Sequence, residues 1–264
     1  MQFTKRLNDR VALVTGAARG IGFGIARRLA LEGASVVIAD ILPEREQAAA
    51  QLESEGLRAV PLALDVRDSR QVAEAFEWAP RRFGKLDILV NNAGVHLVKP
   101  ITDYTDEDWQ FVMDVNARGP FFTMRAAAKV MKERRSGKII NIVTILTGTP
   151  YSSLYEASKH ALMGLTKCLM YELAPYGVTV NAVSPGAVDT DLLKKGIREK
   201  AESSGMTAEE IYSQIASTTP LGRLCQPEDI AATVAFLASP DGDYITGELI
   251  HVTGGAFHQN LGRR

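Results

Sequence analysis

The 264-residue chain has only two cysteines, Cys168 and Cys225. Two cysteines are too few for a disulfide framework or a cysteine-rich metal site, so we expect buried free thiols in a reducing compartment and no metal. No stretch reaches the roughly 18 apolar residues that a membrane span needs. Residues 1–8 also lack the apolar run of a signal peptide. These absences predict a cytoplasmic protein with no membrane partner.

Neither sign of charge dominates, because 30 basic and 31 acidic residues give a net charge of −1. The two signs are interspersed, so no electrostatic field favours nucleic acid as a partner. With 46% hydrophobic and 23% charged residues, the composition is that of an ordinary globular protein with a substantial core. No linker-like tract, low-complexity run or internal repeat divides the sequence. We therefore expect a single domain over residues 1–264.

Short apolar runs rich in β-branched residues alternate with longer amphipathic segments, as they do in parallel sheets covered on both faces. The predicted strands are residues 11–14, 36–39, 59–63, 88–90, 138–143, 178–183 and 249–252. The predicted helices are residues 21–32, 43–55, 69–83, 106–135, 154–175 and 227–238. Pro80 should kink the third helix or end it early. The alternation predicts an α/β fold, a Rossmann-like doubly wound sheet of about seven parallel strands flanked by helices on both faces.

The first predicted strand leads directly into a glycine-rich segment and then a helix. Gly16, Gly20 and Gly22 permit a tight turn and a close backbone approach to a ligand. The helix N-terminus presents free N–H groups to a pyrophosphate. The spacing Gly-x3-Gly-x-Gly differs from the usual dinucleotide fingerprint, so an ordinary glycine-rich turn is the alternative. The position after the first strand of a βαβ unit favours nucleotide binding.

Acidic residues end the second and third predicted strands. Asp40 can accept hydrogen bonds from a ribose diol and would repel a 2′-phosphate, which favours NAD over NADP. The alternative for Asp40 is a turn or helix-capping role. Arg19 argues partly for NADP, because a guanidinium in the glycine turn could meet a 2′-phosphate. Asp65 and Val66 form either a turn or a contact to the adenine ring, and the sequence leaves both open.

Polar residues also follow the fourth predicted strand. Asn91–Gly94 lie where ligands bind in open α/β sheets, although asparagine and glycine suit turns as well. Asn116 falls inside the predicted helix 106–135, where a short polar side chain is locally unfavourable. It faces solvent, bends the helix or holds a water, and the sequence slightly favours the first two. His96 could line a pocket, but a lone histidine is more often structural or exposed.

Tyr155 and Lys159 lie four residues apart, so on a helix they share one face. A fixed cation favours the phenolate, which could tune Tyr155 for proton transfer to or from an alcohol or carbonyl oxygen. By itself this spacing is weak, because most such pairs lie on solvated helix faces.

Together these stretches resemble the short-chain dehydrogenase/reductase family. The matching segments span nearly the whole chain in the family's order: Thr15–Gly22, Asp65-Val66, Asn91–Gly94, Asn116, Tyr155-x-x-x-Lys159, and Asn181–Gly186 with Thr190. The glycine spacing is the family's own version of the nucleotide turn. The resemblance implies a bound nicotinamide dinucleotide, with contacts from Gly16, Arg19, Gly20, Ile21, Gly22, Asp40, Asp65, Val66, Asn92, Tyr155, Lys159, Val188 and Thr190.

The resemblance also implies roles at the reaction centre. Tyr155 would be the general acid/base, and Lys159 would lower its pKa and bind the nicotinamide ribose. Asn116 would hold a water of the proton relay through a local bend of its helix, and Asn92 would contact the cofactor ribose region. Val188 and Thr190 would fix the nicotinamide carboxamide.

In the family, the hydroxyl that binds the reacting oxygen normally belongs to a serine at the end of the fifth strand. This sequence departs from that pattern. Here the alignment places Thr144 at that position. Threonine keeps a hydroxyl that can donate and accept, but its methyl group restricts the rotamers. Thr147 and Ser152 or Ser153 are weaker substitutes.

Residues 187–220 would form a substrate lid, with an inner apolar face made by Ile197, Ala201, Ile211, Tyr212 and Ile215. The resemblance further implies a homotetramer, or a homodimer, built on helices near 106–135 and 154–175. The expected function is hydride transfer between NAD and a secondary alcohol or ketone, including small polyols, sugars and hydroxy ketones. The alternatives are an NADP-dependent carbonyl or 3-oxoacyl reductase and a catalytically silent nucleotide-binding scaffold.

Overall fold

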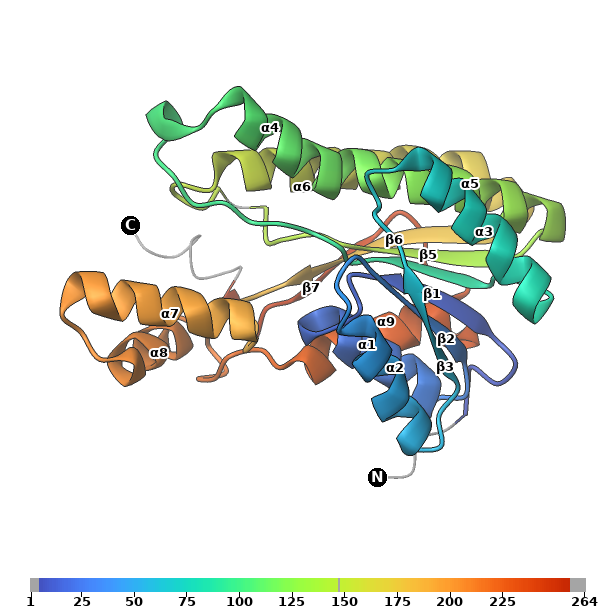
Figure 1. Cartoon of the computed structure of the whole chain (residues 1–264), viewed down its shortest axis with the longest axis horizontal. Helices are drawn as coiled ribbons and strands as arrows, with labels where there is room; N and C mark the ends of the chain where they lie inside the picture. Colours follow the sequence, from blue (N-terminus) through green and yellow to red (C-terminus); the bar gives the residue numbers. More distant parts are fainter. Residues whose placement is uncertain (1–4, 147, 257–264) are drawn as a thin grey trace.

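The computed structural model describes residues 5–146 and 148–256. A parallel sheet of order β3-β2-β1-β4-β5-β6-β7 forms its centre (Figure 1). The strands are β1 (Val11–Thr15), β2 (Ser35–Asp40), β3 (Ala59–Ala63), β4 (Ile88–Asn91), β5 (Gly137–Ile142), β6 (Val178–Pro185) and β7 (Leu249–Val252). All seven predicted strands are present, and the predicted Rossmann-like fold is confirmed. The strand order reverses between β1 and β4, and ligands of such sheets bind in the crevice at this point.

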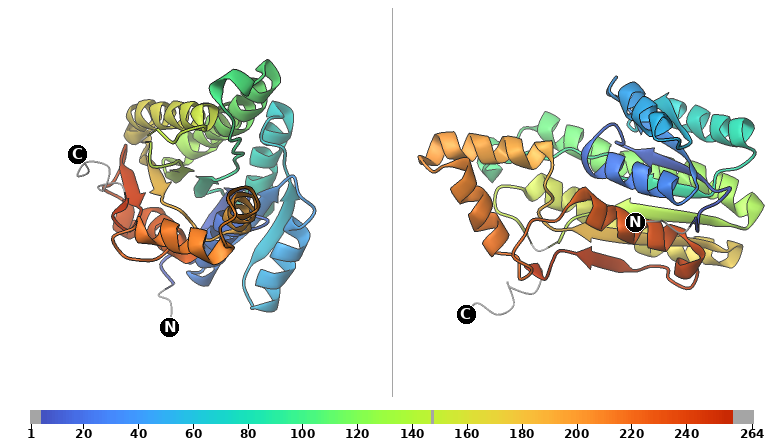
Figure 2. Two further views of the ribbon diagram at one scale, coloured as in Figure 1. Left: turned by 90° about the vertical axis from the view of Figure 1, so that its left-hand side faces the viewer. Right: turned by 90° about the horizontal axis from the view of Figure 1, so that it is seen from below.

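Helices cover both faces of the sheet (Figures 1 and 2). They are α1 (Gly20–Leu31), α2 (Arg45–Ser54), α3 (Ser69–Phe83), α4 (Asp106–Met113), α5 (Gly119–Arg134), α6 (Ser153–Leu173), α7 (Asp191–Ser204), α8 (Ala208–Ser217) and α9 (Pro227–Ala238). One hydrophobic cluster joins the sheet to α1, α2 and α9, and a second joins it to α3, α5 and α6. The pair α7 and α8 extends beyond the carboxyl edge of the sheet.

Two helix predictions need correction. Pro80 does not end α3 early, because the helix continues to Phe83 and closes at Gly84, whose φ of 79° is left-handed. A proline so close to the end removes only one backbone hydrogen bond within the helix. The predicted helix 106–135 is divided into α4 and α5 by a π-helical turn, Asp114–Arg118.

A buried polar network ties α5 and α6 to the middle of the sheet. Asn91 on β4 donates a 2.8 Å hydrogen bond to Asn141 on β5 and accepts one of 2.6 Å from Thr123 on α5. Asn141 in turn donates to Thr166 on α6 at 2.9 Å. Because unsatisfied polar atoms are costly in a core, this network fixes both helices in register with the strands. It was not predicted from the sequence.

Cys168 is exposed and Cys225 is half-buried, and both are free thiols. The expectation of a buried thiol is therefore wrong for Cys168, which lies on the outer face of α6. Among the described residues, none of the helices is both long and apolar enough to cross a bilayer.

Candidate active site

The glycine turn between β1 and α1 is supported by the side chain of Asn92, the residue that directly follows β4. Asn92 donates from Nδ2 to the carbonyls of Thr15 and Gly16 at 3.0 and 2.9 Å, which uses both amide protons. A Cβ at Gly22 would lie 2.2 Å from the Gly16 carbonyl oxygen, so only glycine fits there. Gly20, with φ of 59°, has only Thr190 nearby. The amide of Asn92 therefore supports the turn, and the open side of the turn faces the segment that carries Thr190.

Asp40 ends β2 beside this turn and is buried. Its carboxylate accepts hydrogen bonds of 3.0 Å from the backbone N–H groups of Ala18 and Leu42. These bonds fix the carboxylate at the carboxyl edge of the sheet, next to the exposed Arg19. The turn and the fixed carboxylate suit a dinucleotide whose ribose carries a free diol.

The structure favours the turn interpretation of Asp65. Its carboxylate forms an ion pair with Arg67, which lowers the pKa of Asp65, and it also accepts the Arg67 backbone N–H at 2.9 Å. Val66 is buried and packs against the start of α5, where a Cβ on Gly119 would lie 2.8 Å from Val66 Cγ2.

Tyr155 and Lys159 share one face of α6, as the spacing predicted. The Lys159 Nζ lies 5.7 Å from the centre of the Tyr155 ring. It donates a 2.9 Å hydrogen bond to the backbone carbonyl of Ile142, at the end of β5. Burial of the ammonium lowers the pKa of Lys159 to about 8, because water no longer stabilises the charge. The lysine therefore titrates close to neutral pH.

The pKa of Tyr155 was expected to be lowered, but its net shift in the structure is upward. Burial, followed by the negative charge of Glu156, raises the pKa of Tyr155 to about 12. A hydrogen bond with Thr144 lowers this pKa but does not offset the burial. Desolvation of the phenolate is the largest of these effects. The same hydrogen bond brings the side chains of Thr144 and Tyr155 together.

Asn116 is fully buried in the π-helical turn, so it does not face solvent. Its Oδ1 accepts from the N–H of Val95 at 2.8 Å, and its Nδ2 donates to the Val95 carbonyl at 2.8 Å. Nδ2 also donates to Ser158 Oγ at 3.0 Å. The π turn places this side chain between α6 and the loop after β4, and such turns are frequent at functional sites.

The alternative hydroxyls are placed differently from Thr144. Ser152 Oγ lies 2.9 Å from His96 Nε2, and Ser153 is exposed. Thr147 lies outside the described residues. The His96 ring stacks on Tyr155, with ring centroids 4.4 Å apart. From the sequence, His96 was interpreted as a lone histidine, because its partners Ser152 and Tyr155 lie more than 50 residues away along the chain.

Two loops beside Tyr155 are joined by Tyr104. Its hydroxyl lies 2.8 Å from the Leu97 carbonyl and 2.9 Å from the Tyr151 carbonyl, and the Lys99 N–H also donates to the Tyr151 carbonyl at 2.9 Å. Tyr151 adopts a left-handed φ of 63°, which is unusual for a bulky residue. The loop after β4 and the loop before α6 are thus one connected wall.

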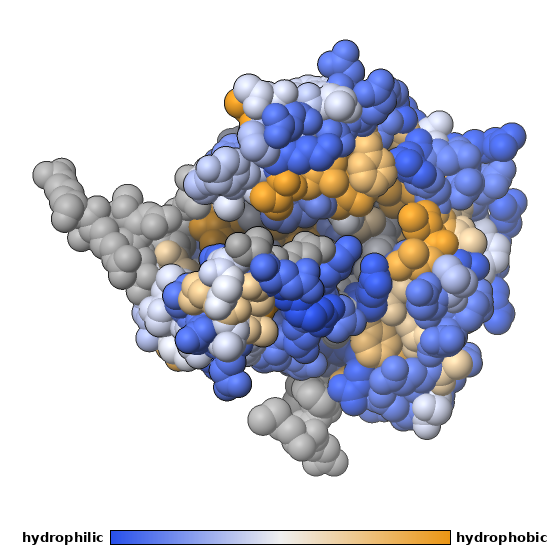
Figure 3. Space-filling view, turned by 60° about the vertical axis from the view of Figure 1, so that its left-hand side comes forward, coloured by the Kyte–Doolittle hydropathy of each residue, from blue (hydrophilic) through white to orange (hydrophobic). Residues whose placement is uncertain are grey.

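The remaining predicted contacts lie in residues 187–220, the segment that was predicted to be a lid. Val188 pairs with Cys225 in an isolated bridge, and Thr190 caps α7 by accepting the Leu193 N–H at 3.4 Å. Ile197 and Ile211 are buried, as expected for the inner face of α7 and α8. Figure 3 brings the side of the molecule that carries α7 and α8 forward and shows a hollow in the surface with hydrophobic side chains around it.

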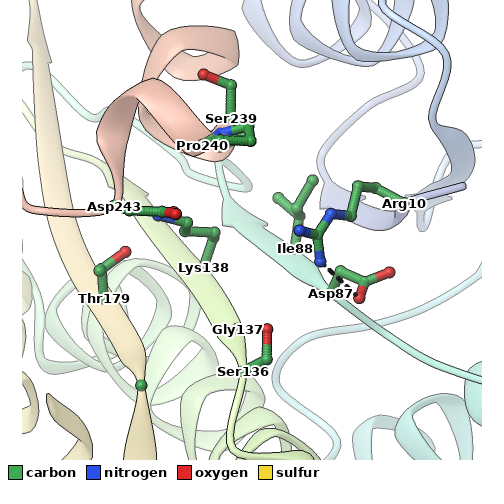
Figure 4. Close-up of a pocket in the computed structure, with 12 residues that line it drawn as sticks. Arg10, Asp87, Ile88, Ser136, Gly137, Lys138, Thr179, Ser239, Pro240 and Asp243 are labelled. Carbon is green, nitrogen blue, oxygen red and sulfur yellow. Dashed lines mark hydrogen bonds and ion pairs between the residues drawn. The ribbon is translucent and has the colours of Figure 1, made fainter. Parts of the chain in front are cut away.

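A separate cavity of about 300 Å³ lies at the amino edge of β4, β5 and β6, far from Tyr155 (Figure 4). Its charged groups are already paired: Lys138 with Asp243 at 2.7 Å and Arg10 with Asp87 at 3.4 Å. No net charge is left over to hold an ionic ligand. No group of three or more potential metal ligands occurs within residues 5–146 and 148–256.

Comparisons with known proteins identify the family. A family model described as enoyl-(acyl carrier protein) reductase matches residues 16–257. The chain is 39% identical to L-2,3-butanediol dehydrogenase of Corynebacterium glutamicum over 95% of its length and 99% of that protein. It is 40% identical to galactitol 2-dehydrogenase of Agrobacterium fabrum, over 95% and 98%.

Comparisons with solved structures indicate the same family. An NAD⁺-bound xylitol dehydrogenase superimposes with a TM-score of 0.88 at 31% identity, covering 94% of this chain and 99% of that one. An actinorhodin polyketide ketoreductase with NADPH superimposes with a TM-score of 0.90 at 34% identity, covering 97% and 99%. The chain is therefore an oxidoreductase of the short-chain dehydrogenase/reductase family.

Proposed function

We propose that the protein is an NAD-dependent dehydrogenase that interconverts a secondary alcohol and its ketone. The observation that carries this proposal is the interaction of the Thr144 and Tyr155 side chains, with the buried Lys159 ammonium 5.7 Å from the centre of the Tyr155 ring. Two such hydroxyls can hold one substrate oxygen between them. Relatives named for butanediol and galactitol support a substrate among small diols, polyols, sugars and hydroxy ketones.

In this mechanism the protein supplies geometry and proton transfer. The nicotinamide, when bound, accepts or supplies the hydride. Tyr155 removes the proton from the substrate hydroxyl or returns it, while Thr144 orients that oxygen. Lys159 holds positive charge beside the phenol and binds the cofactor ribose. Asn116, through its buried position beside Ser158, completes the path of the proton to solvent.

Replacing Tyr155 with phenylalanine tests the mechanism. We expect kcat to fall by about 10² to 10⁴, while the Kd for NADH, measured by fluorescence, changes by less than about twofold because the substitution removes one hydroxyl among many expected cofactor contacts. A variant with substantial turnover would exclude Tyr155 as the acid/base. Absence of turnover by the wild type over a broad panel of alcohols and ketones would instead favour the silent scaffold.

The preference for NAD rests on Asp40, fixed by the Ala18 and Leu42 N–H groups where a 2′-phosphate would have to lie. An NADP-dependent carbonyl or 3-oxoacyl reductase is the rival, supported by the exposed Arg19 and by the relative with NADPH. Kd values of NADH and NADPH for wild type and Asp40→Ala separate the two. We expect the variant to lose NADH affinity and to gain in relative NADPH affinity, whereas an equal loss of both would limit Asp40 to a structural role.

We further propose a homotetramer, or a homodimer, assembled on the outer faces of α5 and α6, and a cytoplasmic location. Phe121 on α5 is 40% exposed and Tyr171 on α6 is 75% exposed. Between such aromatics, exposed Ala157 and Gly164 allow two helices to approach closely. Light scattering of the wild type and of Gly164→Arg tests the interface: the variant should have a smaller mass if α6 lies within it.

A further inference from the structure

His96 is held beside Tyr155 by two different contacts. The faces of the two rings lie together, with centroids 4.4 Å apart and planes inclined by 39°. The imidazole Nε2 lies 2.9 Å from Ser152 Oγ, a serine that is almost completely buried. A stacked ring whose edge is also hydrogen-bonded has little freedom to rotate, so the second nitrogen, Nδ1, has a fixed position.

Within the described part of the chain, the hydrogen bonds of His96 use Nε2 and leave Nδ1 without a protein partner. The residue is nevertheless exposed on one side. Partial burial lowers the pKa of His96 and so favours the neutral imidazole, while Glu156 opposes this effect and Lys159 strengthens it. A neutral imidazole offers one donor and one acceptor. The nitrogen that is not used by Ser152 can therefore bind a neutral polar group of a ligand.

The location of this nitrogen limits which ligand group it can meet. The substrate oxygen that reacts would lie between the hydroxyls of Tyr155 and Thr144. His96 belongs to the wall beside that point, and Tyr104 fixes this wall by joining the Leu97 and Tyr151 carbonyls. The His96 imidazole, whose ring contacts that of Tyr155, is therefore close enough to the reacting oxygen to meet a neighbouring group of the same substrate.

Resting on the function proposed above, we infer that His96 is a specificity-determining residue whose Nδ1 binds a second oxygen of the substrate, on the carbon next to the reacting carbon. The site would then select vicinal diols and α-hydroxy ketones over simple secondary alcohols. Ser152 is the positioning residue, because it fixes the imidazole without touching the substrate. No bond is made or broken in this contact, which contributes to recognition alone.

Substitutions of His96 distinguish the contribution of Nδ1 from that of Nε2. Asparagine places a polar atom near the position of Nδ1, whereas the longer glutamine places one near the position of Nε2. His96→Asn should therefore retain part of the selectivity, while His96→Gln and His96→Phe should lose it. His160 on α6 is exposed and bonded to the carbonyl of its own helix at Glu156. His160→Asn and His160→Gln are the matched controls.

The first measurement is the ratio of kcat/KM for 2,3-butanediol to that for 2-butanol, repeated with trans-1,2-cyclohexanediol and cyclohexanol. Loss of a hydrogen bond to a substrate hydroxyl should lower this ratio about tenfold in His96→Phe and His96→Gln. The ratio should fall less in His96→Asn and remain constant in both His160 variants. An equal loss for diols and simple alcohols, with the ratio unchanged, would show that His96 only supports Tyr155 and would overturn the inference.

A binding measurement does not depend on turnover. In the Tyr155→Phe protein with NAD, the ¹⁵N resonances of His96, assigned by their absence in His96→Asn, are followed while each alcohol is added. We expect Nδ1 to shift with the diol and not with 2-butanol. A shift without turnover by the wild type would refute the proposed function and keep the diol contact. Turnover without a diol-specific shift would refute the contact and keep the proposed function.

Discussion

Lys159 on α6 donates a 2.9 Å hydrogen bond to the carbonyl of Ile142, the last residue of β5. Lys159 is thus tied to the strand that leads into Thr144, and this bond connects the two candidate catalytic segments. The ammonium loses its water to make this contact, and the resulting cost can be measured through the pH dependence of stability.

The first prediction concerns the free-energy cost of burying the Lys159 ammonium. Burial lowers the pKa of Lys159 from 10.5 to about 8, so between these pH values the unfolded chain binds more protons than the folded one. Stability attributable to the lysine therefore rises with pH across this window. Relative to Lys159→Met, the wild type should gain about 2 kcal/mol in free energy of unfolding between pH 8 and pH 10.

Urea unfolding at both pH values measures this gain. Lys167→Met, which removes an exposed lysine from the same helix, is the control and should show no such change. A constant difference between wild type and Lys159→Met would mean that the ammonium is better solvated than its burial indicates.

Glu156 provides a second prediction, because its charge raises the pKa of the neighbouring Tyr155. Glu156→Gln removes this charge, so the pKa of Tyr155 falls and the phenolate becomes available at lower pH. The rising limb of the pH–rate profile for alcohol oxidation should move to lower pH by about half a unit to one unit. Glutamine can still accept the Thr149 N–H, which keeps the loop in place.

The control for this profile is Glu172→Gln, at the exposed end of the same helix, which should leave the midpoint unchanged. A profile of Glu156→Gln that coincides with that of the wild type would show that Tyr155 does not control the limb.

Asn116 is expected to be important for folding as well as for catalysis. Asn116→Ala leaves the N–H and the carbonyl of Val95 without their partners and removes a bond to Ser158. The free energy of unfolding should fall by about 2 to 4 kcal/mol. Ser158→Ala, which removes only the serine end of the network, should cost about 1 kcal/mol. Chemical denaturation at pH 7 measures both, and equal costs would argue that Val95 can find other partners.

The glycine turn gives a fourth prediction. A Cβ at Gly22 would lie 2.2 Å from the Gly16 carbonyl and 2.5 Å from Asn92 Nδ2, so Gly22→Ala must open the turn. We expect the affinity for NADH to fall about tenfold or more, because the backbone N–H groups leave the pyrophosphate site. Gly196→Ala is the matched control: nothing lies within 4 Å of its Cβ, and a helix interior favours alanine by up to about 1 kcal/mol.

The strands and the catalytic helix were predictable because their signals are local. Buried parallel strands are continuous apolar runs, and Tyr155 and Lys159 meet through helical spacing alone. A local bend of helix 106–135 at Asn116 was expected from the family resemblance, but its form as a π turn and the bonds of Asn116 to Val95 were not predictable from the sequence. The support that the amide protons of Asn92 give to the carbonyls of Thr15 and Gly16 was likewise not predicted, because these residues are more than 70 positions apart.

The direction of the pKa shift of Tyr155 could not be predicted from the sequence either. Spacing reveals that a cation is near the phenol, but the pKa depends on how much water the fold removes. Only the tertiary structure shows that burial, with Glu156, exceeds the other effects. The contact of His96 with Ser152 is equally long-range, since the two residues are 56 positions apart.

The hydroxyl of Tyr104 has a consequence for how this site can evolve. Since it joins the Leu97 and Tyr151 carbonyls, a change in one loop is transmitted to the other. Substitutions that alter substrate range in the two loops should therefore be non-additive while Tyr104 is present. In a Tyr104→Phe background the same substitutions should combine more independently, and this chain would acquire new specificities through single steps in either loop.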